Sequence, residues 1–200
     1  MHRVQRSLRP FYVILAAGSA SRMGFAKVFT ALGNLSPLQR IASVLGEREA
    51  LSVVPTAMLA AAREQAPATR IVPNDAPELG MAHSLQLALH EIERDRAVGV
   101  VLADMPFLSP TLLDALESLA AMSDADVIYP ENDAGVPGHP VLFSSRARGV
   151  LERLPSGDTI RIARDEPSLI RRVLPFEHPG AYTDLDTPDD WERFVNDDRG

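Results

Sequence analysis

Cysteine is absent from this chain of 200 residues. Its absence excludes disulfide bonds, zinc–thiolate centres and cysteine nucleophiles, and it leaves the redox compartment undetermined. Long apolar runs are absent as well. The run FYVILAA, at 11–17, is too short for the apolar region of a signal peptide and far too short to cross a bilayer. We therefore predict a cytoplasmic protein with no membrane partner.

An excess of positive charge is the third thing that the sequence lacks. With 20 basic and 27 acidic residues the formal net charge is −7, so the surface as a whole repels nucleic acid. We predict no nucleic-acid partner. No linker rich in Pro, Gly or Ser and no repeat interrupts the chain. The sequence therefore predicts a single domain over 1–200, whose basic start, 1–10, is a flexible tail.

What the sequence does contain is an alternation of apolar runs with segments of helical spacing. Several runs are apolar at every position, as strands covered on both faces are. Two helical segments open on Ser-Pro pairs, a favourable N-cap and first position. The predicted strands are 11–16, 51–54, 98–103 and 126–129, with weaker ones at 69–72, 140–143 and 170–174, and the predicted helices are 36–47, 80–95, 109–122 and 187–194. This alternation predicts an α/β domain around a mostly parallel sheet, with ligands beyond the carboxyl ends of its strands.

The loop after the first predicted strand, AAGSASRMG at 16–24, combines small residues with positive charge. Small residues let backbone N–H groups approach a ligand closely, and successive amides form an anion-binding concavity. Arg22 and Lys27 are placed to neutralise phosphate charge. Neither the dinucleotide fingerprint G-x-G-x-x-G nor the phosphate loop G-x-x-x-x-G-K-[ST] is present. The alternative is a tight strand–helix connection that carries two surface cations.

Carboxylates follow two other strand-like segments. Asp104 comes directly after the run VGVVLA, where it is well placed to hold a hard cation or, alternatively, to cap the next turn. Asp184 and Asp186 are two residues apart and share a face of an extended chain, although Asp186 or Thr187 could cap the closing helix. Cations in the first loop suit a triphosphate, and carboxylates suit the Mg²⁺ that accompanies it. Together these residues predict phosphoryl or nucleotidyl transfer.

Five segments of the sequence, in this order, resemble the MobA-like nucleotidyltransferases. They are LAAGSASRMG followed by Lys27, NDAPELGMAHSL at 74–85, LADMP at 102–106, GVPGHPVLF at 135–143 and TDLDTPDDW at 183–191. The last two, taken with LAAG, point to the branch that contains molybdenum cofactor cytidylyltransferase. The resemblance implies a three-layer α/β/α Rossmann-like nucleotidyltransferase fold with a mixed, mostly parallel sheet. It also implies an activity: the terminal phosphate of molybdopterin attacks the α-phosphorus of CTP, and pyrophosphate leaves.

The same resemblance implies roles for individual residues. Lys27, Arg22 and Asp104 would be the catalytic residues. Magnesium would sit on Asp104 with Asp186 or Asp184. The residues implied for the nucleotide are Leu15, Ala16, Ala17 and Gly18 near the base, Ser21, Arg22 and Lys27 near the phosphates, and Asn74, Gly80 and Ser84 near the base or ribose. His139 and Asp158 would face the acceptor, although His139 could equally be a structural residue of its own turn.

Two departures from the family pattern keep other functions open. Ala26 stands where a proline usually precedes the lysine, and Gly157-Asp158-Thr159-Ile160-Arg161 replaces the pattern G-D-x-G-A-R. The second change favours, as an alternative, a nucleotidyltransferase that acts on a sugar phosphate or another phosphorylated metabolite. A third hypothesis is a maturation factor that binds a cofactor or nucleotide without turnover. Besides the nucleoside triphosphate and the molybdopterin-type acceptor, the predicted partners include a transient molybdoenzyme or maturation protein.

Overall fold

Seven strands form one sheet in this computed structural model, which describes residues 9–17, 25–31, 33–185 and 190. The strands are β1 (Phe11–Leu15), β2 (Ala50–Pro55), β3 (Arg70–Asn74), β4 (Val98–Leu102), β5 (Val127–Glu131), β6 (Val141–Phe143) and β7 (Arg171–Pro175). Their order across the sheet is β3-β2-β1-β4-β6-β5-β7, and β6 runs antiparallel to both of its neighbours. The sheet is therefore mixed and mostly parallel, as the sequence predicted, and the three weaker strand predictions are confirmed.

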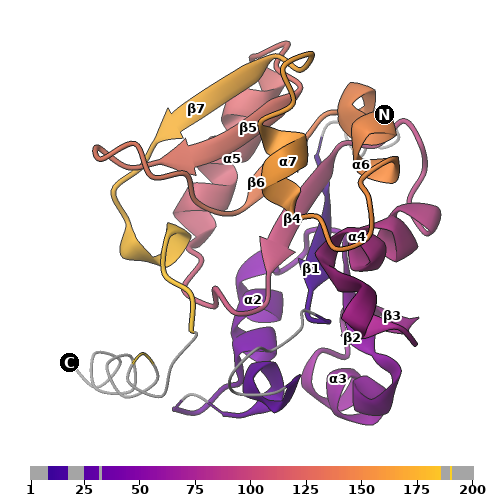
Figure 1. Cartoon of the computed structure of the whole chain (residues 1–200). Helices are drawn as coiled ribbons and strands as arrows, with labels where there is room; N and C mark the ends of the chain where they lie inside the picture. The colour runs from indigo at the N-terminus through magenta and orange to yellow at the C-terminus, as the bar shows by residue number, and fades with distance from the viewer. Residues whose placement is uncertain (1–8, 18–24, 32, 186–189, 191–200) are drawn as a thin grey trace, which may run out of the picture.

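Helices cover both faces of the sheet and make three layers (Figure 1). The α-helices are α2 (Pro37–Leu45), α3 (Leu59–Gln65), α4 (Gly80–His90), α5 (Pro110–Ala121), α6 (Arg148–Glu152) and α7 (Ile160–Arg164), and the 3-10 helices are η1 (Phe25–Phe29), η2 (Thr56–Met58), η3 (Pro77–Leu79), η4 (Ser145–Ala147) and η5 (Pro179–Ala181). One core packs α4, α6 and α7 on one face, and a second core packs α2, α3 and α5 on the other. Successive residues of β1 enter opposite cores, which explains why that strand is apolar at every position.

The starts of α2 and α5 follow from local chemistry. Ser36 Oγ accepts a hydrogen bond from Gln39 N at 3.2 Å, and Ser36 N donates to Gln39 Oε1 at 2.8 Å, which is a capping box. Ser109 Oγ accepts a hydrogen bond from Leu112 N at 3.2 Å. The helix predicted over 80–95 ends at His90, and α3, α6 and α7 were not predicted. No helix in the described part of the chain is long and apolar enough to cross a membrane.

Both predicted terminal elements lie mostly outside the described residues. Residues 1–8 of the predicted tail are outside them, whereas Pro10 is buried and the Arg9 carbonyl accepts a hydrogen bond from Arg96 Nη2 at 3.3 Å. Of the helix predicted at 187–194, Asp190 alone is described, and it is helical.

The direction in which the chain adds strands to the sheet reverses between β1 and β4. From β1 the chain adds β2 and then β3 on one side, and β4 pairs with β1 on the other side. The carboxyl ends of β1 and β4 are therefore the topological switch point, where open α/β sheets bind ligands. Leu15 and Leu102 are in register at this edge.

Candidate active site

The switch point brings together a lysine and a carboxylate that are far apart in the chain. Lys27 lies on η1, which follows the loop after β1, and Asp104 lies in the turn after β4. Lys27 Nζ is 3.8 Å from Asp104 Oδ2. The lysine side chain is 10% exposed and the aspartate side chain 34%, so the amine is largely buried while the carboxylate still reaches solvent. A partly buried ion pair of this kind fixes the amine beside the open carboxylate.

A third segment, from the end of the described chain, holds both residues through its backbone. Lys27 Nζ donates a hydrogen bond to the Leu185 carbonyl oxygen at 3.0 Å, and Leu185 N donates to the Asp104 carbonyl oxygen at 2.9 Å. Leu185 itself is fully buried. One peptide unit on each side of Leu185 therefore orients the two charged residues, and its side chain anchors them to the core.

The path of this segment is set by close backbone packing. At Gly180, on η5, an added Cβ would lie 1.7 Å from the carbonyl oxygen of Phe107, so only glycine fits there. On its other side, His139 N donates a hydrogen bond to the Ala181 carbonyl oxygen at 2.9 Å. The segment thus passes between the turn after β4 and the residues before β6, and it reaches Lys27 and Asp104 along a fixed route.

The residues predicted for a metal fit a site with few protein ligands. Asp104 is open to solvent at the edge of the sheet, Asp184 is exposed beside Leu185, and Asp186 lies outside the described residues. Within the described ranges, no group of three or more His, Cys, Asp or Glu side chains could hold a metal ion. Magnesium prefers one or two carboxylates completed by water and substrate phosphates, so this donor set is compatible with it.

Three of the residues predicted for the nucleotide, Gly18, Ser21 and Arg22, lie outside the described residues. Leu15, Ala16 and Ala17 are buried, with their side chains in the two cores. The amide of Ala16 donates to the Val53 carbonyl oxygen at 2.9 Å, and the Leu15 carbonyl oxygen accepts from Ala103 N at 3.1 Å. The side chains of these residues therefore pack in the cores at the end of β1, and any contact with a base would be made by backbone groups.

Asn74 and Ser84 contact each other instead of presenting polar groups to solvent. Asn74 Nδ2 donates to Ser84 Oγ at 3.0 Å, and Ser84 Oγ donates to the Gly80 carbonyl oxygen at 3.2 Å. Asn74 Oδ1 accepts from Ala76 N at 2.9 Å. Asn74 and Ser84 are at most 1% exposed. Their visible role is to fix the loop 74–80 on the first turns of α4, so ligand contacts would come from that loop's backbone.

The two residues predicted for the acceptor lie in different surroundings. Asp158 is half-buried in the turn before α7, and its amide donates to the Pro155 carbonyl oxygen at 3.1 Å. His139 is half-buried, yet its Nδ1 atom is buried and has no hydrogen-bond partner among the described residues. Burial lowers the pKa of His139 to about 4. A hydrogen bond with the Val100 backbone opposes this shift, and the positive charge of Arg164 adds to it. At neutral pH the ring is therefore uncharged.

The lowered pKa of His139 predicts a specific loss of stability in acid. Its pKa of about 4 in the folded protein lies below the ordinary histidine value of 6.5, so the unfolded chain binds the proton more readily. Stability then falls as the pH drops from about 6.5 towards 4, and urea unfolding should show a loss of about 1–2 kcal/mol between pH 7 and pH 5 from this group. His139→Gln should remove that part of the pH dependence. An unchanged dependence in the variant would contradict the assignment.

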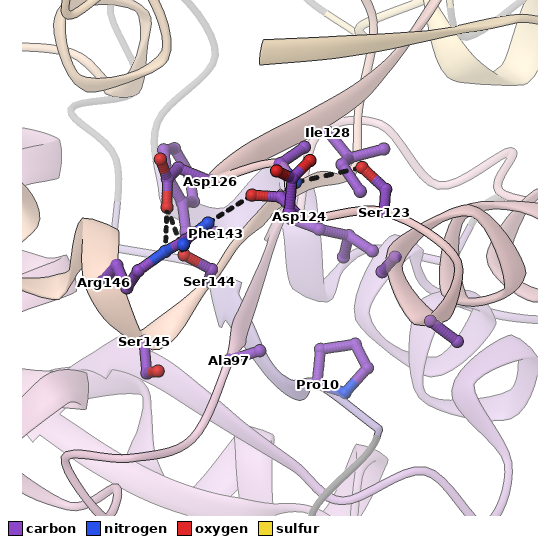
Figure 2. Close-up of a pocket in the computed structure, with 14 residues that line it drawn as sticks. Pro10, Ala97, Ser123, Asp124, Asp126, Ile128, Phe143, Ser144, Ser145 and Arg146 are labelled. Atoms are coloured by element: carbon purple, nitrogen blue, oxygen red, sulfur yellow. Dashed lines mark hydrogen bonds and ion pairs between the residues drawn. The ribbon is translucent and has the colours of Figure 1, made fainter. Parts of the chain in front are cut away.

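A cavity of about 410 Å³ opens at the opposite edge of the sheet, among residues that precede β1, β4 and β5 (Figure 2). Asp126 in its wall accepts hydrogen bonds from Ser144 Oγ at 2.9 Å, Arg146 Nε at 2.8 Å and Ile170 N at 3.1 Å. Burial alone raises the pKa of Asp126, but these hydrogen bonds outweigh it and lower the pKa below its usual value. The carboxylate joins three chain segments and lies at the edge away from Lys27.

Sequence reasoning missed the backbone of Leu185 as a part of this site. It also missed Gln65, whose Nε2 donates to the Phe29 carbonyl oxygen at 2.9 Å and supports η1, which carries Lys27. Neither residue belongs to a polar motif. Leu185 lies between the two aspartates that drew attention to the segment. A hydrogen bond made by the main chain does not require a particular side chain, so the sequence does not indicate it.

An amine and a solvent-accessible carboxylate thus lie at the switch point of a mostly parallel sheet, where α/β proteins bind ligands. The sequence model of the MobA-like NTP transferase domain matches residues 12–174, and the chain belongs to this family of nucleotidyltransferases. A curated relative, the probable molybdenum cofactor guanylyltransferase of Natronomonas pharaonis, is 32% identical over 199 residues, which cover 90% of this chain and 94% of that protein.

Solved structures of low sequence identity share the fold. A homolog of Mycobacterium tuberculosis Rv0371c from Mycobacterium sp. strain JC1 superposes with a TM-score of 0.81 at 23% identity, covering 95% of this chain and 96% of that one. Rv0371c of M. tuberculosis H37Rv in complex with manganese superposes with a TM-score of 0.75 at 21% identity, covering 94% of this chain and 98% of that one. These structures confirm the predicted fold class, and the family match and the curated relative confirm the predicted enzyme class.

Proposed function

We propose that this nucleotidyltransferase moves a cytidylyl group from CTP to the terminal phosphate of molybdopterin and releases pyrophosphate. The observation that carries the proposal is the 3.8 Å approach of Lys27 Nζ to Asp104 Oδ2 at the switch point of the sheet. Nucleotidyl transfer needs positioned charge and little covalent work by the protein, and this pair supplies charge of both signs.

The reaction assigns a task to each of the two residues. An oxygen of the acceptor phosphate forms a bond with the α-phosphorus, and the bond from that phosphorus to the bridging oxygen breaks. The bridging oxygen leaves with its electron pair as part of pyrophosphate. Lys27 would bind the α-phosphate and stabilise the negative charge that develops there. Arg22, which lies outside the described residues, would bind the β- and γ-phosphates.

Asp104 would bind magnesium together with Asp184 or Asp186. A magnesium ion held there would supply positive charge that offsets the negative charge of the phosphate groups. The partial exposure of the Asp104 side chain, 34%, supports this role, since a carboxylate that binds a metal–triphosphate must be reachable. The manganese complex of Rv0371c supports a divalent ion on this fold. Without nucleotide, Lys27 serves as a counter-ion for the carboxylate.

Two observations bear differently on the base. The segments LAAG, GHP and DLDTP resemble the cytidylyl branch and support CTP. The relative from N. pharaonis is named a guanylyltransferase, and this name favours GTP as the second candidate. Loop 74–80 and the end of β1 would contact the base through backbone groups, because the side chains of Leu15, Asn74 and Ser84 are buried.

A panel of nucleotides tests the proposal. The purified chain is incubated with Mg²⁺ and each of CTP, GTP, ATP and UTP, with molybdopterin, with a sugar phosphate or with no acceptor, and pyrophosphate release is measured. We expect release that requires molybdopterin and is fastest with CTP. Preference for GTP would move the chain to the guanylyl activity, and release that requires a sugar phosphate would remove molybdopterin. Nucleotide binding without turnover would favour the maturation factor.

A further inference from the structure

Helix α4 supports two loops that come from distant parts of the chain. The first, residues 74–80, is fixed to the helix by the hydrogen bonds from Asn74 to Ser84 and from Ser84 to Gly80. The second, residues 152–158, is fixed to the same helix by Gln86. Its Nε2 atom donates to the carbonyl oxygens of Glu152 at 3.2 Å and Leu154 at 2.8 Å. A single helix thus carries both loops.

The two loops also contact each other directly. Gly157 N donates a hydrogen bond to the Leu79 carbonyl oxygen at 3.0 Å. Gly80 and Gly157 have φ angles of 88° and 89°, a backbone region that favours glycine. A Cβ added to Gly80 would lie 3.2 Å from Gly157 Cα, so no side chain separates the two backbones. The two loops are therefore in direct backbone contact.

Gln86 on α4 holds the start of the second loop, which contacts the first loop through Gly157. Glu152 is the last residue of α6, where the last carbonyl groups of a helix have no partner within the helix, and Leu154 lies two residues beyond it. Helix α6 itself is held elsewhere, since the buried Arg148 donates from Nη1 to the Glu93 carbonyl oxygen at 2.9 Å. Loss of the Gln86 amide would thus loosen the segment after α6 while α6 stays in place.

We propose that Gln86 is a positioning residue that couples the nucleotide loop, 74–80, to the acceptor loop, 152–158. This proposal rests on the proposed function, which places the nucleotide at the first loop and the acceptor near Asp158 in the second. When a nucleotide restrains loop 74–80, the contact between Gly80 and Gly157 restrains the acceptor loop as well. The acceptor then binds more tightly to the nucleotide complex than to the free enzyme, and the coupling is reciprocal.

Two variants of Gln86 separate its N–H groups from its bulk. Gln86→Met keeps the length of the side chain and has no donor, whereas Gln86→Lys keeps donors that can reach both carbonyl groups. We expect Gln86→Met to raise the KM for the acceptor about ten-fold, while the Kd for the nucleotide alone, measured by calorimetry, changes less than about two-fold. Gln86→Lys should stay close to the wild type in both quantities.

Hydrogen exchange of the backbone amides gives a second readout that needs no turnover. In the wild type, adding Mg²⁺ and the nucleotide preferred in the panel should slow exchange over residues 152–160, and in Gln86→Met this protection should be lost. The proposal is overturned if Gln86→Met leaves the KM for the acceptor unchanged, or raises the KM for the acceptor and the Kd for the nucleotide together. It is also overturned if Gln86→Lys is as defective as Gln86→Met, or if the nucleotide gives no protection in the wild type. A wild type that shows the protection but transfers nothing would refute the proposed function alone, and a wild type that binds no nucleotide would refute both.

Discussion

Replacing Asp104 with asparagine is expected to lower kcat for nucleotidyl transfer about 1,000-fold, because the variant keeps the shape of the side chain and loses the charge that would bind Mg²⁺. The main chain of Asp104 still accepts the hydrogen bond from Leu185, so the fold should persist. Initial rates at saturating substrates and increasing Mg²⁺ are the measurement. A partial recovery at high Mg²⁺ would fit weakened metal binding.

A matched control exists at the other edge of the sheet. Asp124→Asn makes the same chemical change at an exposed carboxylate beside the cavity of Figure 2, far from the switch point, and its rate should stay at the wild-type level. If Asp104→Asn retained more than about a tenth of the wild-type kcat with an intact fold, Asp104 would have no part in charge stabilisation of the size that catalysis requires.

Replacing Lys27 with methionine is expected to lower kcat about 100-fold or more, because an amine aimed at the α-phosphate contributes mainly where charge develops during transfer. Lys27 is the only lysine among the 20 basic residues of the chain. Everywhere else the chain uses arginine, yet the position beside Asp104 is 10% exposed and holds a compact ammonium that donates to the Leu185 carbonyl oxygen. A planar guanidinium is larger and is not interchangeable with an ammonium there.

Lys27→Arg is therefore the informative companion variant. It keeps the charge and loses the shape, and we expect its kcat to stay at least about ten-fold below the wild type while its thermal stability falls little. Stopped assays and a melting curve for each variant are sufficient. Wild-type kcat in Lys27→Met would show that the amine serves only as a structural partner of Asp104.

The strands and the position of the site were predictable because both follow from residue type. Apolar residues at every position of β1 mark a strand between two layers, and strand–helix alternation places ligands at one edge of the sheet. Helices α6 and α7 were missed because each has five residues, too few for an apolar period to repeat. Helix α6 packs on α4 and α7 packs on α6, and no local sequence pattern indicates these contacts.

The details of the site were less predictable, for a related reason. Asn74 and Ser84 were taken as ligand contacts from motif resemblance, and in the structure their polar atoms bond to each other and to the backbone. A motif records that a residue type is needed at a position, and it does not record whether the need is for binding or for support. Leu185 illustrates the converse, since a main-chain role can be met by many residue types.

The solitary ammonium beside Asp104 gives this protein a built-in reporter. Growth on lysine labelled with ¹⁵N at the ζ position would yield a single side-chain nitrogen resonance, already assigned by composition to Lys27. The Leu185 carbonyl oxygen and the Asp104 carboxylate lie beside it, so a change at either group would alter its chemical shift. Titration with nucleotide or divalent ion would then be followed at the reaction centre itself, with no probe attached.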